Sequence, residues 1–396
     1  MASSIAFTVT ELLNNTLSFL SSIDLKSAIL VCKNFQETGE RMLHSDLKLT
    51  PKKVDVAEGY VERTAGNSSF KKLEMDLAVD FWRIISILRL LPHRSRSGIT
   101  SLEISASTHS ISPGWAETTN KLSSRLRTLL PAVVSLVIQP IHYSLQEKML
   151  QSFSAVTTLT LFEGLTTIHG HEWSTFVLPS LTNLTLVTSN ETSTNLLPLV
   201  DRYLCAARLT HLTIALHSRD RSQFEAIPRL CRTYQPTLSF LRIIGSDGLD
   251  VYSDDFFIEP IPSSGKLREI DIESCIMHVF LPFEGNQAFP ALETLVIEAS
   301  FRAIDKGWGS TNWERIVEVI DRLRSVSAKL STVSCGYRRG EPVQGYGCRD
   351  VFIKRLKEAA TGSTLGFPVE QVCRPELPRY WRPTDNQHPW GDLAND

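Results

Sequence analysis

Two short stretches show the repeating pattern of this sequence most clearly: residues 181–186 read LTNLTL and residues 209–214 read LTHLTI. In each, apolar residues stand at positions i, i+3 and i+5, with polar residues between them. Because i+3 and i+5 are two residues apart, they share one face of an extended segment, and the polar residues share the other. Each stretch therefore predicts a short strand with one buried face.

The same spacing recurs along most of the chain. From Leu73 to Val333 the i+3 position advances 260 residues in nine steps, or about 29 residues per unit. The individual steps vary from 23 to 38 residues but do not drift, and a recurring unit of about this length is typical of repeat architectures. The ten triplets are Phe70/Leu73/Met75, Ile99/Leu102/Ile104, Val133/Leu136/Ile138, Val156/Leu159/Leu161, Leu181/Leu184/Leu186, Leu209/Leu212/Ile214, Leu238/Leu241/Ile243, Leu267/Ile270/Ile272, Leu292/Leu295/Ile297 and Leu330/Val333/Cys335.

Several segments between the triplets have helical spacing instead. The clearest stripe runs from Thr311 to Arg324, and apolar residues three or four apart form weaker stripes beginning at Phe81, Leu122, Leu196 and Phe224. We expect the stripe at Phe224 to give a short or kinked helix, because Pro228 interrupts it.

One strand and one helix per unit predict an α/β fold with parallel strands on one side and helices on the other. This pattern resembles the leucine-rich repeat over roughly residues 65–340. The asparagine that this family places eight positions after the first apolar residue is replaced by Gly164 and Ser189, so we expect an irregular leucine-rich-repeat solenoid. A doubly wound α/β sheet is the alternative.

Residues 5–48 do not fit the repeat and predict three short helices, too small a core to be secure alone. The segments Glu11-Leu12-Leu13, Leu17-Ser18-Phe19-Leu20, Asp24-Leu25 and Val31-Cys32-Lys33-Asn34-Phe35 resemble the F-box in order and spacing. The chain is thereby similar to F-box proteins with leucine-rich repeats of the irregular, fungal-like type. It departs from the F-box where Thr8-Val9 replaces Leu-Pro and Phe35 replaces tryptophan.

The resemblance implies that this all-α module binds a Skp-type adaptor and, through it, a cullin. It nominates seven adaptor-binding residues: Leu12, Leu13, Leu17, Leu20, Leu25, Val31 and Phe35. Alternatively, the helices only cap the first strand of the solenoid. The expected domains are the helical module at 1–48, the solenoid at 49–365 and a closing tail rich in proline and aromatic residues at 366–396.

Composition excludes several classes of protein. The chain has 396 residues with 42% hydrophobic and 21% charged residues, which favours ordered structure. Its net charge of −2 gives no overall attraction to nucleic acid or to an anionic membrane. No stretch is apolar for long enough to span a membrane, and seven scattered cysteines without a CxxC motif are typical of reduced thiols in cytosol or nucleus.

Signals for catalysis are weak. The cluster His169-Gly170-His171-Glu172 contains metal-capable side chains but lacks further ligands at a recognisable spacing. The glycines between Gly336 and Gly347 do not form a known phosphate-binding motif. We therefore expect no enzymatic activity, catalytic residue, metal or cofactor.

The strand alternation also predicts a binding face. If Leu184 and Leu186 point inward, the residues at +2, +4 and +6 of each unit line the open face of the sheet. On this face we expect a substrate protein to contact Phe162, Phe240, Arg242, Glu269, Asp271 and Glu273, with the phenylalanines as anchors and the acids steering association. Alternatively, the carboxylates are ordinary solvated strand charges and the phenylalanines pack under loops. The predicted function is substrate recognition in a cullin-based ubiquitin ligase, or alternatively a leucine-rich-repeat interaction scaffold with no ubiquitin link.

Overall fold

The computed structural model describes residues 45–64, 70–106, 115–164, 173–189, 196–217, 220–245, 258–274, 276–281, 288–298, 313–338 and 369–374. The protein is an α/β protein with a large parallel sheet. It divides into two compact units, unit 1 (Met1–Leu159) and unit 2 (Thr160–Asp396). Among the described residues, no helix combines the length and the apolar character needed to cross a bilayer.

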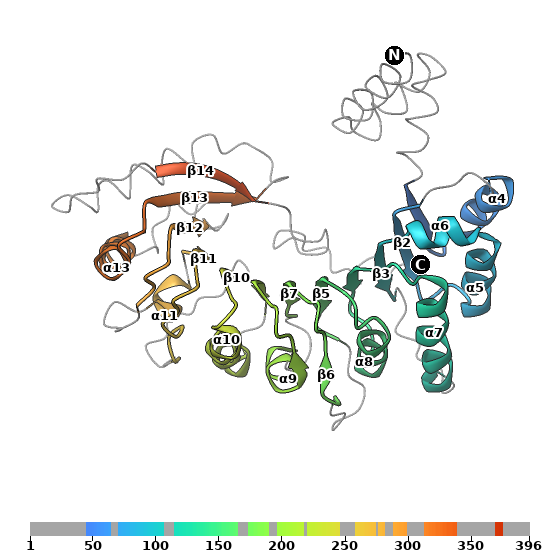
Figure 1. The fold of residues 1–396 in the computed structure, drawn as a ribbon, viewed down its shortest axis with the longest axis horizontal. Coiled ribbons are helices and arrows are strands. Elements are labelled where there is room, and N and C mark those ends of the chain that lie inside the picture. Colours follow the sequence, from blue (N-terminus) through green and yellow to red (C-terminus); the bar gives the residue numbers. More distant parts are fainter. Residues whose placement is uncertain are drawn as a thin grey trace, which may run out of the picture. The chain divides into compact units, whose positions relative to one another are not determined.

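Unit 1 alternates strands and helices. The strands pair in parallel in chain order, and the helices cover one side of them (Figure 1). Its strands are β1 (Asp46–Leu49), β2 (Lys72–Asp76), β3 (Ser101–Ser105) and β4 (Ser135–Ile138). Its helices are α4 (Val54–Thr64), α5 (Phe81–Leu90), α6 (His93–Gly98), α7 (Trp115–Leu129) and α8 (Tyr143–Ser152).

Unit 2 repeats this arrangement. Strand β5 (Thr158–Phe162) crosses the boundary at Leu159, and the strands after it pair in parallel in the order β7-β9-β10-β11-β12-β13-β14. These strands are β7 (Asn183–Val187), β9 (His211–Leu216), β10 (Phe240–Gly245), β11 (Glu269–Glu273), β12 (Thr294–Glu298), β13 (Thr332–Arg338) and β14 (Val369–Arg374). The helices are α9 (Leu196–Tyr203), α10 (Arg221–Tyr234), α11 (Met277–Phe280) and α13 (Trp313–Val326), and β6 (Phe176–Val177) pairs with β8 (Leu204–Cys205).

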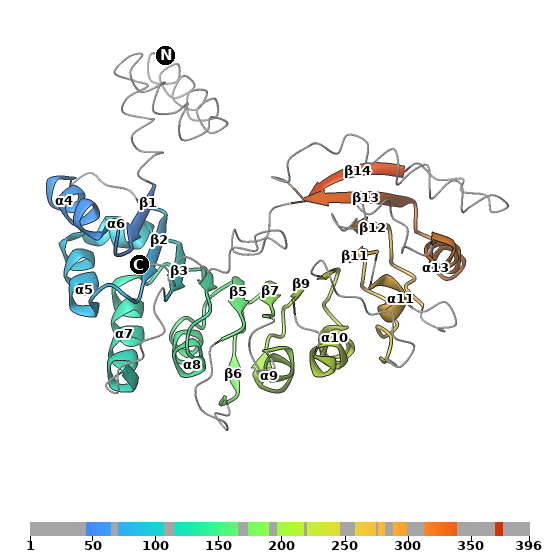
Figure 2. The same ribbon diagram turned by 180° about the vertical axis from the view of Figure 1, so that it is seen from behind.

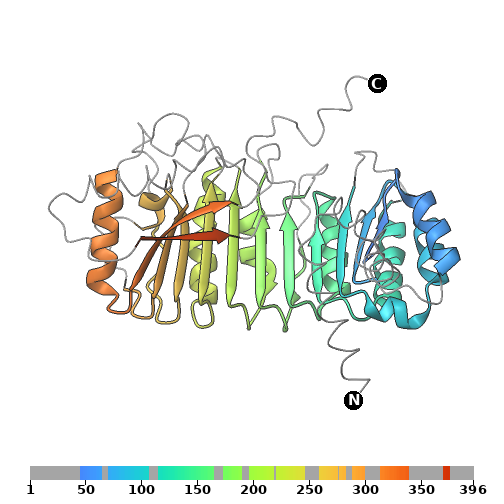
Figure 3. The ribbon, with the colours of Figure 1, turned by 90° about the horizontal axis from the view of Figure 1, so that it is seen from above.

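All ten predicted strands are present, and their predicted inner face is confirmed. Every triplet side chain that the structure describes is at most 8% exposed, and Leu184, Leu212 and Leu241 are at most 1% exposed. These three leucines are register partners on neighbouring strands. The green and yellow strands of unit 2 lie side by side in front of their helices in Figure 3, and Figure 2 shows the helices on one side only. Within each unit this excludes the doubly wound alternative, which needs helices on both faces.

Main-chain hydrogen bonds tie each unit to the next. The carbonyl of Thr182 accepts from the N–H groups of Thr210 and His211, both at 2.9 Å. The carbonyl of Thr210 in turn accepts from Ser239 at 2.9 Å and Phe240 at 3.0 Å. The same two-donor pattern recurs before β2, β3 and β4 in unit 1. Because the backbone makes this ladder, the array holds together without a regular asparagine ladder.

Two strands of the large sheet, β1 and β14, lie in stretches where none was predicted, as do the two-residue strands β6 and β8. β1 falls at the end of the range expected for the helical module, and Leu47 and Leu49 are buried beside Leu73 and Met75. The sequence shows this unit incompletely, because its first apolar position is taken by His44. β14 lies in the range expected for the closing tail and ends just before Pro375, the first of the closely spaced prolines that follow.

Helix α10 is not short, which was one of the two outcomes expected from Pro228. It runs from Arg221 to Tyr234 with Pro228 inside it. Proline removes one hydrogen bond from the helix, but the apolar stripe on both sides of it is buried, from Phe224 to Tyr234. Burial of that stripe outweighs the local cost, which is why the helix continues.

Candidate binding face

The open face of the sheet is the side opposite the helices. Its side chains come from positions +2 and +4 of each unit, which alternate with the buried triplet positions. Most +2 side chains are exposed or half-buried, from Lys72 in β2 to Thr332 in β13. A row of side chains at fixed spacing is therefore available for contact along the strands of each unit.

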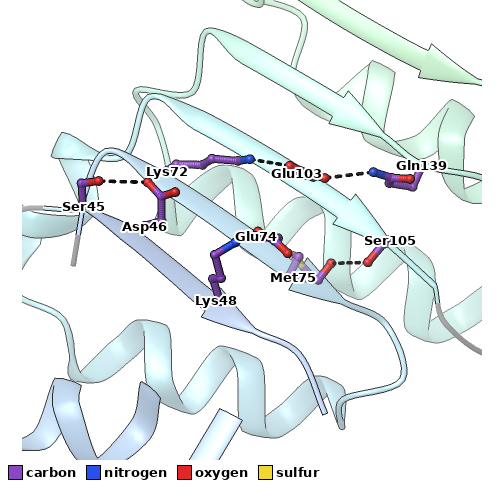
Figure 4. A network of polar contacts seen from close by, with 9 residues as sticks. All are labelled: Ser45, Asp46, Lys48, Lys72, Glu74, Met75, Glu103, Ser105 and Gln139. Atoms are coloured by element: carbon purple, nitrogen blue, oxygen red, sulfur yellow. Dashed lines mark hydrogen bonds and ion pairs between the residues drawn. The ribbon is translucent and has the colours of Figure 1, made fainter. Parts of the chain in front are cut away.

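In unit 1 the open face carries a network of charged side chains, drawn in Figure 4. The Lys48 ammonium lies 2.5 Å from the Glu74 carboxylate on the neighbouring strand. Lys72 pairs in the same way with Glu103 at 2.5 Å, and the Gln139 amide donates to the other Glu103 oxygen at 2.9 Å. These charges are matched within the network, so this part of the face is polar without being strongly acidic or basic.

The pKa of Lys72 reports its surroundings. Partial burial by itself would lower this pKa, but the hydrogen bond to Glu103 and the charges of Glu103, Glu74 and Asp46 raise it above the ordinary value of 10.5. The ammonium form is therefore held on the open face at every physiological pH. A partner that contacts β2 and β3 meets fixed lysine and glutamate charges at known positions.

In unit 2 the open face is nearly neutral and contains an aromatic pair. His211 and Phe240 are register partners on β9 and β10, with ring centroids 5.4 Å apart and planes inclined by 32°. Asn183 is the register partner of His211 on one side, and Glu269 is the partner of Phe240 on the other. His211 is exposed, and its Nδ1 lies 2.9 Å from the Thr210 hydroxyl. The +2 row therefore presents amide, imidazole, phenyl and carboxylate groups side by side.

The structure corrects the expectation that all six nominated residues are open to a partner. Phe240 and Glu269 are half-buried, whereas Phe162 is 5%, Arg242 3% and both Asp271 and Glu273 0% exposed. Position +6 is buried on every strand from β5 to β12, and from β10 onward position +4 is buried too. Strand alternation correctly predicted that these residues do not lie on the triplet face. Four of the six are nevertheless buried by other parts of the protein. Acids so deeply buried cannot steer association through solvent.

The buried charges form an internal cluster on β10, β11 and β12. The Arg242 Nε lies 2.7 Å from Glu298 Oε1 and 3.3 Å from Asp271 Oδ2. The Glu273 carboxylate accepts a hydrogen bond from the Gly245 N–H at 2.5 Å. Buried charges persist only when they are paired and hydrogen-bonded, so this cluster fixes the relative placement of three strands.

A second buried polar cluster was not predicted from the sequence. Glu163 follows β5 and accepts from the Ser189 N–H at 2.5 Å and from the Gln223 amide at 3.2 Å. The Gln223 oxygen accepts from the Leu197 N–H at 3.0 Å. These bonds join the turns after β5 and β7 to helices α9 and α10. The sequence showed that Gly164 replaces the expected asparagine. It gave no indication that Gln223 would take part, because Gln223 lies 60 residues after Glu163 in the chain.

The seven residues nominated for the adaptor, Leu12 to Phe35, lie outside the described residues, as do His169, His171 and most of the tail. Within the part of the chain that the structure describes, no group of three or more His, Cys, Asp or Glu residues is placed to hold a metal ion. The open face described above consists of side chains from neighbouring strands. Compared with models of known protein families and with the sequences of curated proteins, the chain matches none.

Proposed function

We propose that this chain is a repeat protein that binds another protein through the open face of its parallel strands. The observation that carries the proposal is the agreement between ten sequence repeats and ten parallel strands, which presents +2 side chains at regular spacing on the side without helices. Extended faces of this kind suit protein recognition, because many side chains can contact one partner at once.

More particularly, we propose that the chain is the substrate-recognition subunit of a Skp–cullin–F-box ubiquitin ligase in the cytoplasm or nucleus. The support is the resemblance of residues 5–48 to the F-box, together with the repeat array that follows it. Leu12, Leu13, Leu17 and Phe35 are among the residues that would contact a Skp-type adaptor. Catalysis would then belong to the partners, and this chain would supply only binding.

The substrate would contact the +2 row of unit 2. Phe240 offers an apolar anchor, and His211 beside it is exposed and adds ring surface to the same spot. Aromatic residues carry a large share of the binding energy at protein interfaces. Around them the neutral Asn183 and the half-exposed Thr185 and Thr213 impose little desolvation cost.

The two binding activities can be tested separately. Leu13→Asp with Leu17→Asp would bury unpaired charge at the adaptor interface and should abolish co-purification with a Skp-type adaptor. His211→Ala with Phe240→Ala should leave adaptor capture intact and weaken a substrate identified by mass spectrometry. The measurement is a quantitative pull-down of both variants beside the unchanged protein.

The outcomes distinguish three roles: ubiquitin-ligase subunit, scaffold, and capping of the first strand by the helices. If the leucine double variant stays folded and still captures the adaptor, the ubiquitin-ligase role is wrong. If the chain binds partner proteins but never an adaptor, it is instead a leucine-rich-repeat scaffold with no ubiquitin link. Such a scaffold needs only the repeat array for binding. If the leucine variant loses its folded state by circular dichroism, the helices serve as a cap for the first strand.

A further inference from the structure

The outer helices of unit 1 carry an apolar pair that is not covered. Trp82 and Leu90 on α5 are 53% and 46% exposed. Both belong to the outward side of the helix, because Ile84, Ile85, Ile87 and Leu88 take the buried side. A tryptophan this exposed leaves a large apolar area in water, which marks a contact site more often than an isolated small residue does.

Two arginines flank the pair. The Arg125 guanidinium of α7 lies over the Trp82 ring, 4.6 Å from its centroid. Arg89 is exposed and stands seven residues after Trp82, which places it two helical turns along the same side of α5. The stacked guanidinium holds the tryptophan and its own charge in one place, so the site is ordered before any partner arrives.

The surroundings of the pair are basic. The described side chains of α5, of α6 and of Lys121–Leu129 in α7 include no carboxylate. Three acids before α5 and on α4 already have internal roles: Asp80 caps α5 by accepting from the Arg83 N–H, and Asp55 and Glu58 pair with the Arg83 guanidinium. Trp82, Leu90, Arg89 and Arg125 therefore form a small apolar and positive surface, the Trp82 patch (α5 and α7 in Figure 1).

We propose that the Trp82 patch is a docking surface for an acidic protein segment that carries an apolar side chain. The apolar side chain would pack on Trp82 and Leu90, and carboxylates on either side of it would pair with Arg89 and Arg125. Protein is the occupant that this chemistry favours. Nucleic acid and anionic membranes are held by longer series of cations than the two arginines of this patch. The patch lies on the helix side of unit 1, so this inference is independent of the proposed substrate face.

The test uses the purified full chain and three fluorescent probes. One is a short peptide with glutamates around a central leucine and phenylalanine, the second has lysines in place of the glutamates, and the third has serines in place of the apolar pair. Fluorescence anisotropy should show binding of the first peptide alone, weakening as salt is added. Trp82→Ala and Arg125→Gln should each reduce its affinity by about tenfold.

Arg127→Gln is the matched control, because Arg127 is exposed on the same helix but points to another side of it. It should change the affinity by less than about twofold. Thermal unfolding of each variant shows whether the fold is kept, and Arg89→Gln provides a second surface change that removes no buried contact. The proposal fails if the acidic peptide does not bind, or if it binds equally to the Arg125→Gln and unchanged proteins. It fails also if anionic vesicles or a single-stranded oligonucleotide bind at this patch in preference to the peptide.

Discussion

At the scale of single residues, substitutions on the buried face of a strand should cost much more stability than substitutions on its open face. On β9, Leu212 is fully buried between its partners Leu184 and Leu241, whereas the next residue, Thr213, is half-exposed on the open face. Removing buried methyl groups leaves a cavity, whereas trimming a half-exposed threonine mainly loses strand propensity.

We therefore expect Leu212→Ala to lower the free energy of unfolding by about 2 to 5 kcal/mol. Thr213→Ala, the matched control one residue away, should cost less than about 1 kcal/mol. Urea unfolding followed by circular dichroism measures both. Equal losses in the two variants would contradict the assignment of Leu212 to the inner face.

The buried cluster around Arg242 leads to a second expectation. Arg242→Met removes the cation that pairs with Glu298 and Asp271 and should destabilise the protein by about 3 to 5 kcal/mol, because the buried carboxylates would lose this partner. Arg268→Met changes an exposed arginine just before β11 and should shift stability by under about 0.5 kcal/mol. A similar midpoint of denaturation for both variants would show that the cluster contributes little.

Two described cysteines should differ in reactivity. Cys205 is exposed, whereas burial raises the pKa of the Cys231 thiol from 9.0 to about 12. A thiol reagent followed by peptide mass spectrometry should label Cys205 in the folded protein and Cys231 only after unfolding, since the thiolate is the reactive form. Rapid labelling of Cys231 in the folded state would contradict its burial in α10.

The sign of the pH effect follows from the same shift. The folded pKa of Cys231 lies above its unfolded value, so this thiol stabilises the folded state fully below pH 9.0, and the contribution is lost as the pH rises to about 12. Cys231→Ala should therefore reduce the loss of stability over that alkaline range, measured by unfolding at several pH values. An unchanged alkaline slope would assign the loss to other groups.

At the scale of elements, the caps of the helices set where the chain turns. Asp220 precedes α10, and its carboxylate accepts from the Ser222 N–H at 2.9 Å. The helix starts there although it contains Pro228, so the cap and the buried stripe act together. The negative charge of Asp220 also lies at the positive end of the helix dipole.

Asp220→Ala should accordingly cost about 0.5 to 2 kcal/mol, while Asp220→Asn keeps an acceptor at the same position and should cost clearly less. Guanidinium unfolding of the three proteins decides the comparison. If alanine and asparagine give the same stability as aspartate, the side chain does not cap α10 in solution.

At the scale of the whole molecule, each unit is held mainly by contacts between neighbouring repeats. The main-chain ladder before the strands is indifferent to side-chain identity, so the open face is free to vary along the chain. It does so: β1 to β3 carry matched lysine and glutamate charges, whereas β7 to β10 carry threonine, asparagine and an aromatic pair. A partner held by the array would therefore be selected by the side chains of particular strands.

The sequence by itself determined ten of the twelve strands of the large sheet and their buried face. Alternation of side chains is a local property of extended chain, so the triplet at Leu181, Leu184 and Leu186 is enough to assign which side is inward. The same local rule missed β1, where His44 interrupts the triplet. It also left open whether the helix at Phe224 would be short, because burial along all of α10 was not visible locally.

Only the tertiary structure decided which open-face residues are accessible. Arg242, Asp271 and Glu273 have the alternation of exposed strand residues, yet they are buried and paired inside the protein. Their burial depends on which parts of the chain cover β10 to β12, and pairing such as that of Arg242 with Glu298 joins residues 56 positions apart. The spacing of residues within a strand predicts neither this burial nor this pairing. Solvent exposure is set by the whole folded chain and not by the strand that bears the side chain.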